Sequence, residues 1–120
     1  MIKTHKDLEI WEESIELVIN IYKTLEKFPD SEKFVLASQM QRAVISIPSN
    51  IAEGAARQSR KEFIKYLYIA LGSLSELETQ LIISERLGYL KEKSLFASIE
   101  KIRRKILNFI KYLKNKDEEK

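Results

Sequence analysis

Cysteine is absent from the 120 residues, and histidine occurs once, as His5. Without cysteine the chain has no disulfide framework, no thiolate metal site and no thiol nucleophile, which fits a reducing compartment. One histidine is too few for the paired Glu-x-x-His motifs of di-iron helical bundles. It also lies outside the body of the predicted fold, and there is no glycine-rich phosphate loop. We therefore expect no enzyme, no cofactor and no bound metal.

Turn-forming residues and long apolar runs are also scarce. Three glycines and two prolines leave little turn chemistry and no long flexible linker. No stretch approaches about 18 uninterrupted apolar residues, as a membrane span requires, and the N-terminus lacks the apolar core of a signal peptide. With 44% hydrophobic and 32% charged side chains, residues 1–120 suit one cytoplasmic domain without membrane association.

Apolar residues recur at alternating steps of three and four along four segments, the spacing that places them on one face of a helix. Short connections between such helices favour antiparallel neighbours. The sequence thus predicts an all-α, up-down-up-down antiparallel four-helix bundle. The predicted helices span about 5–28, 31–57, 60–87 and 92–114, and the polar tail 115–120 is expected to fray.

The second predicted helix contains a proline, Pro48. Apolar residues keep their register on both sides of it, so the helix is expected to kink there and continue. Gly54 stands where a neighbouring helix can approach closely. Gly88 is expected to end the third helix as a left-handed cap.

The first predicted helix carries two apolar sets that lie about 110° apart around its axis. One apolar face is enough for a four-helix core, so the second is expected to contact another copy of the chain. We assign to the core the set that shows the alternating spacing: Leu8, Trp11, Ile15, Val18, Tyr22 and Leu25. The predicted contacts between copies are Ile10, Leu17 and Ile21, with Phe28 in the same set.

A polar stripe follows the second predicted helix, and three interpretations of it remain open. In the first, Glu53 pairs with Arg57 within the helix, and Ser46 or Ser49 compensates for the donor that Pro48 lacks. In the second, the stripe is a hydrogen-bond network between subunits. In the third, its arginines bind a ligand or nucleic acid. The stripe consists of Arg42, Ser46, Asn50, Glu53, Arg57 and Arg60.

The formal net charge of +3 is distributed unevenly. Residues 1–30 hold four lysines and seven acidic residues, whereas residues 91–120 hold ten basic and five acidic residues. An acidic helix face and a basic one could pair within or between subunits. Alternatively, the basic face binds phosphates, with an affinity that falls steeply with salt. The candidate nucleic-acid-binding residues are Arg57, Arg60, Lys101, Arg103, Arg104, Lys105 and Lys111, and Tyr89 and Tyr112 either stack on bases or rim the core.

The run QRAVISIPSNIAEG at residues 41–54 closely resembles the signature of the bacterial four-helix-bundle proteins encoded in intervening sequences of 23S ribosomal RNA genes. Shorter similarities, such as residues 8–11, 61–63 and 70–73, extend the resemblance over nearly the whole chain. It implies a bundle that assembles as a ring-like homopentamer. The signature and contact candidates are Arg42, Ser46, Pro48, Ser49, Asn50, Glu53 and Gly54, together with Ile10, Leu17 and Ile21.

The resemblance also implies kinship with the accessory variability proteins of diversity-generating retroelements, which resemble basic pentameric barrels that bind nucleic acid and a reverse transcriptase. The family's own activity is essentially unassigned. We therefore expect a non-catalytic homo-oligomer, pentameric by resemblance, that binds or scaffolds RNA or DNA. The alternative is a protein-interaction scaffold without a nucleic-acid role, whose partner is another protein.

Overall fold

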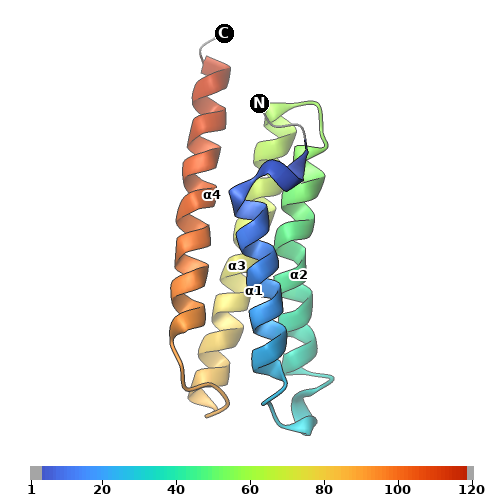
Figure 1. Cartoon of the computed structure of the whole chain (residues 1–120), viewed down its shortest axis with the longest axis vertical. Helices are drawn as coiled ribbons and strands as arrows, with labels where there is room; N and C mark the ends of the chain where they lie inside the picture. Colours follow the sequence, from blue (N-terminus) through green and yellow to red (C-terminus); the bar gives the residue numbers. More distant parts are fainter. Residues whose placement is uncertain (1–3, 119–120) are drawn as a thin grey trace.

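The chain folds into four long helices, each packed against the next in sequence, with α4 returning to α1 (Figure 1). This structure is a computed structural model that describes residues 4–118. The bundle measures 53 × 20 × 19 Å. The predicted all-α up-down architecture is confirmed. The helices are α1 (Glu9–Leu25), α2 (Leu36–Ala55), α3 (Arg60–Arg86) and α4 (Ser94–Glu118), with 3-10 turns η1 (His5–Asp7) and η2 (Asp30–Glu32).

A continuous apolar core runs along the bundle axis and receives side chains from all four helices. On α3, the alternating spacing from Phe63 to Leu81 is buried throughout, as its sequence pattern predicts. The largest fully buried side chains are Leu17, Ile21, Met40, Ile47, Ile51, Leu67, Leu74, Leu77, Leu81, Ile99, Ile102 and Ile106.

The face of α1 that packs in this core is not the predicted one. Ile10, Leu17 and Ile21 are buried within a single chain, so their assignment as contacts between copies is wrong. The set predicted for the core is divided: Leu8 and Leu25 at the two ends of α1 are buried, whereas Trp11 is partly buried and Tyr22 is exposed on the flank of the helix. The core therefore takes the second apolar set together with the two ends of the first.

Two features fix this rotation of α1. Ser14 is fully buried between Ile10 and Leu17, with its hydroxyl donating to the Trp11 carbonyl oxygen at 2.7 Å. Because a serine interrupts the apolar spacing between Ile10 and Leu17, this set looks less regular in the sequence than the set from Leu8 to Leu25. The rotation also turns Glu13 toward α4, where its carboxylate meets lysines.

The helix ends differ from the predicted bounds by three residues or more at four places, one of which is the end of α1, at Leu25 instead of 28. Helix α1 begins only at Glu9, since the preceding residues form η1. Helix α2 begins five residues later than predicted, because η2 and the non-helical Val35 (φ −119°, ψ −95°) precede it. Helix α4 continues through residues 115–118, so the predicted fraying is wrong there, and residues 119–120 lie outside the described part. Lysine and glutamate are good helix formers, so loss of apolar content does not by itself end a helix.

Helix α2 remains helical through Pro48, as predicted, and the proline ring is buried. Gly54 lies against the first turns of α3, where Phe63 and Tyr66 leave no space for a side chain. Gly88 follows α3 with a φ of +85°, a left-handed conformation that favours glycine. Gly54, near the C-terminal end of α2, therefore lets α2 and α3 come together closely.

Candidate nucleic-acid interface

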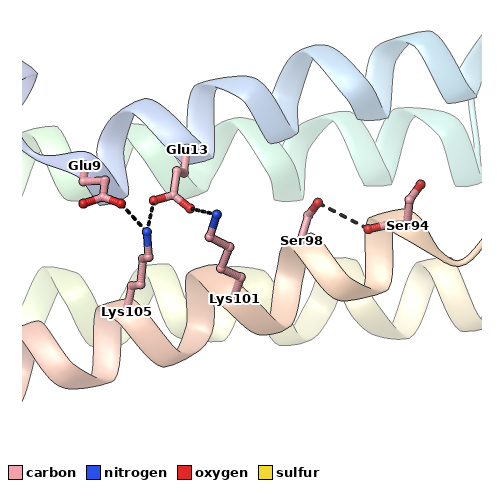
Figure 2. Close-up of polar contacts among 6 residues, drawn as sticks. All are labelled: Glu9, Glu13, Ser94, Ser98, Lys101 and Lys105. Atoms are coloured by element: carbon pink, nitrogen blue, oxygen red, sulfur yellow. Dashed lines mark hydrogen bonds and ion pairs between the residues drawn. The ribbon is translucent and has the colours of Figure 1, made fainter.

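The middle of α4 faces α1 through ion pairs (Figure 2). The Nζ of Lys105 lies between the carboxylates of Glu9 and Glu13, at 2.5 Å from Glu13. The Nζ of Lys101 lies 3.6 Å from Glu13. The acidic face of α1 and the basic face of α4 thus pair within one chain, which confirms the first interpretation of the uneven charge. These two lysines are partly neutralised and offer less charge to an external phosphate.

The pairing moves the pKa values of both partners away from their ordinary values. The hydrogen bond from Lys105 lowers the pKa of Glu9 below 4.5, and the hydrogen bond to Glu13 raises the pKa of Lys105 above 10.5. Glu9 therefore stabilises the fold above pH 4.5, and this contribution is lost as the pH falls through its folded-state pKa. Lys105 stabilises the fold below pH 10.5, and this contribution is lost as the pH rises through its folded-state pKa.

We accordingly predict that the contribution of Glu9 and Lys105 to the urea midpoint is nearly constant between about pH 5 and pH 10. The midpoint should fall below and above this pH range. Glu9→Gln should reduce the fall on the acid side, because it removes the carboxylate that must be protonated. Glu12→Gln is the matched control, since Glu12 is exposed and forms no ion pair within residues 4–118. Urea denaturation followed by circular dichroism measures both, and equal acid profiles for the two variants would contradict the prediction.

Two of the candidate arginines also bind carboxylates. Arg103 joins α4 to α3, with 2.9 Å from its Nη2 to Glu78 and 2.6 Å from its Nη1 to Glu100. The Glu78 carboxylate raises the pKa of Arg103 above its usual value. Arg57 donates through Nη2 to Glu53 and to the Tyr66 hydroxyl, both at 2.8 Å. These arginines hold the bundle together and retain only part of their capacity for an external anion.

The seven candidate residues do not form one continuous basic surface. Lys101 and Lys105 face α1, Arg103 faces α3, and Arg57 lies at the end of α2. Two of the others, Arg104 and Lys111, are exposed and form no ion pair within the described residues, and Arg60 is the partly buried first residue of α3. A uniformly basic face along α4 is therefore not what the chain presents.

Positive charge gathers instead at one end of the bundle. The start of α3 and the last turns of α4 lie at this end, near the connection between α2 and α3 (Figure 1). Residues 60–69 and 108–118 together hold six basic residues and three acidic ones, Glu62, Asp117 and Glu118. We call these six residues the basic end: Arg60, Lys61, Lys65, Lys111, Lys114 and Lys116.

Three tyrosines lie among these cations. The Lys114 Nζ donates to the Tyr68 hydroxyl at 3.1 Å and lies 5.4 Å from the centre of its ring. Lys116 lies over Tyr112 at 5.6 Å, and Arg57 over Tyr66 at 5.0 Å. Sequence reasoning missed Tyr66 and Tyr68, because they meet cations of other helices. The local signal that was available is the presence of tyrosines next to lysines, in KYLY at residues 65–68 and in KYLK at residues 111–114.

The model of the 23S rRNA-intervening sequence protein family matches residues 6–112, most of the chain. The chain belongs to this family. Among solved structures, it is similar to a protein of unknown function from the S23 ribosomal protein family of Bacteroides thetaiotaomicron VPI-5482, with a TM-score of 0.76 and 30% identity over 85% of this chain and 98% of that one. No curated protein matches it. Family membership thus supplies the fold without an activity.

In this 23S rRNA-intervening sequence protein, the signature run joins α2 to α3. The Ser46 and Ser73 hydroxyls are 2.8 Å apart, and the Asn50 Nδ2 donates to the Ser46 carbonyl and hydroxyl oxygens at 2.8 and 2.9 Å. This network lies within one chain and makes Ser46 and Asn50 part of the packing of α2 against α3. The predicted pair of Glu53 with Arg57 is confirmed. The remaining polar members, Arg42 and Ser49, are exposed.

Within residues 4–118, no group of three or more acidic, histidine or cysteine side chains is placed to hold a metal ion. None of the described helices is long and apolar enough to cross a membrane.

Proposed function

We propose that this chain is a non-catalytic nucleic-acid-binding protein that acts as a homo-oligomer and contacts nucleic acid through the basic end. One observation carries the proposal: three cations of mid-α4, Lys101, Arg103 and Lys105, are paired with carboxylates, whereas six cations outnumber three acidic residues at the end of the bundle. Lysines at such a surface release counterions from a phosphate backbone when they bind it, which drives association at low salt. The lysine stems and tyrosine rings there also supply apolar contact area.

Assembly is supported by the flank of α1 that the core does not use. Ile19 and Tyr22 are exposed large apolar residues on α1, and Ile45 is one on the neighbouring α2. Tyr22 and Ile45 line the same shallow hollow, together with polar residues of α2, so exposed apolar side chains of the two helices lie near each other. A second copy is the proposed cover. A pentamer, as the resemblance implies, would have a mass of five times 14.1 kDa, about 70 kDa, and would repeat the basic end five times.

The proposal predicts a strong effect of lysine substitutions at the basic end. Lys111→Glu combined with Lys114→Glu should weaken binding of structured RNA and of duplex DNA by at least about tenfold at low salt. It should also reduce the slope of log affinity against log salt by about one unit or more per lysine. Fluorescence anisotropy across a salt series measures both quantities.

The matched control reverses two exposed lysines at the opposite end of the bundle, Lys23→Glu with Lys27→Glu. This variant carries the same change in net charge, so it should lose much less affinity if the basic end is the site. Equal losses in the two variants, or no binding of either nucleic acid at low salt, would rule out the proposal.

A protein-interaction scaffold is the second candidate, and one observation favours it. Phe34 and Val35, just before α2, are 85% and 61% exposed. An aromatic side chain this exposed commonly marks a contact surface. The scaffold candidate gains support if a discrete protein partner survives nuclease treatment and is lost with Phe34→Asp.

A further inference from the structure

We propose that the basic end prefers single-stranded nucleic acid, with bases stacking on Tyr68 and Tyr112. This inference rests on the proposed function and specifies the form of nucleic acid that the site selects. It follows from how the two tyrosines are held and from what lies between them.

Both rings are accessible, and that of Tyr112 is supported from below. Tyr68 is 46% exposed and Tyr112 is 51% exposed. The Tyr112 ring stacks on Phe109, with 6.0 Å between centres and 12° between planes, so Phe109 fixes its orientation. Phe109 in turn packs edge-on against Phe63 of the bundle at 5.4 Å. The ring that would receive a base is thus anchored through two aromatic contacts to the core, which lowers the entropy cost of binding.

A lysine lies on the path between the two tyrosines. Tyr68 borders α4 on its α3 side, because Lys114 of α4 reaches its hydroxyl. Tyr112 borders α4 on its α1 side, where it lines a hollow with Ile10. At about 100° per residue, Lys111 lies between Lys114 and Tyr112 around α4, about 60° from the first and about 100° from the second. A strand crossing α4 therefore meets a ring, a cation and a second ring in order.

The lysines over the rings suit an exchange of partners. The ammonium groups of Lys114 and Lys116 lie 5.4 and 5.6 Å from the ring centres of Tyr68 and Tyr112. A stacked base takes the place of the ammonium on the ring, and the released ammonium can meet the phosphate beside that base. Each pair of tyrosine and lysine then binds one nucleotide, the tyrosine through the base and the lysine through the phosphate.

This arrangement distinguishes single strands from duplexes. In a duplex the bases already stack on their neighbours, so their faces are closed to a side chain and only the phosphates are available. In a single strand every base has a free face, and stacking on an aromatic side chain contributes about 1–3 kcal/mol per base. The two tyrosines therefore add affinity for single strands only.

Fluorescence anisotropy with a labelled single-stranded RNA of about 12 nucleotides, its DNA counterpart and the matching duplexes tests the inference. The single strands should bind at least about tenfold more tightly than the duplexes at about 50 mM salt. Tyr68→Ala with Tyr112→Ala should remove at least about tenfold of the single-strand affinity and leave duplex affinity within about twofold. Tyr68→Phe with Tyr112→Phe should retain single-strand affinity, because the rings remain.

The control is Phe34→Ala, which removes an exposed aromatic ring that also has a lysine over it, Lys33 at 5.7 Å, but lies before α2 at the far end of the bundle. It should leave both affinities unchanged. Binding that depends on the basic-end lysines but is equal for single strands and duplexes, or unaffected by loss of both tyrosine rings, would overturn the inference and leave the proposed function standing. Absence of binding to every probe would overturn the proposed function itself.

Discussion

Replacing Gly54 with valine is expected to lower the free energy of unfolding by about 3 kcal/mol, at the upper end of what overpacking of a core costs. A Cβ at position 54 would lie 2.8 Å from the Tyr66 Cβ and 3.0 Å from the Phe63 Cδ1. The Tyr66 Cβ is attached directly to the backbone, so it cannot move aside without moving α3. Helices α2 and α3 would have to separate at this point. Alanine should produce a smaller loss of about 1 kcal/mol, since it adds the Cβ with these contacts but not the two further methyl groups of valine.

Gly72 provides a matched control for this substitution. It also lies inside a helix, but a Cβ built on it would have no atom within 4 Å. Gly72→Ala should therefore raise the free energy of unfolding by about 0.5–1 kcal/mol, the usual gain of alanine over glycine within a helix. Urea denaturation of the two alanine variants should show opposite signs. The same sign in both would mean that the approach of α2 to α3 does not depend on Gly54.

The sequence pattern determined most of the fold because the helices are long and amphipathic. On α3 the alternation from Phe63 to Leu81 is regular over nearly twenty residues, so it predicted the core-facing side even though other apolar residues, such as Ile69 and Ile83, are exposed. On α1 two apolar faces compete, and periodicity alone cannot choose between them. The choice depends on Glu13 meeting Lys105, a contact between residues 92 apart in sequence. The predicted start of α2 was wrong for a related reason: the non-helical backbone conformation of Val35 is not marked by any turn-forming residue at that position.

The candidate site was only partly predictable, for the same physical reason. The excess of positive charge in residues 91–120 was visible in the sequence, but the carboxylates that neutralise it come from α1 and α3. What remains after this pairing is the basic end, which is assembled from α3 and α4. Tyr68 and Lys114 meet there across 46 residues, so neither would be linked to the other by spacing along the chain. A run of basic residues on a helix therefore predicts ion pairs with neighbouring helices of the same chain as much as it predicts a binding surface.

Replacing Ile21 with alanine is expected to lower the free energy of unfolding by about 2–5 kcal/mol, the range for truncating a large buried side chain. Ile21 is 0% exposed within a single chain, so the substitution leaves a cavity that the packed helices can only partly close. If Ile21 instead served only to contact another copy, the isolated fold would tolerate the change. Thermal or urea unfolding of the purified protein measures the loss.

Ile19→Ala is the matched comparison, because it changes the same residue type two positions away on the same helix at a side chain that is 50% exposed. Its effect on the unfolding of one chain should stay within about 0.5 kcal/mol. Light scattering should instead show weakened self-association, since Ile19 lies on the apolar flank of α1 that a second copy is proposed to cover. The two variants thus separate folding from assembly on one helix. Loss of assembly with Ile21→Ala and intact folding, together with no effect of Ile19→Ala on either property, would mean that α1 presents the opposite face to the core.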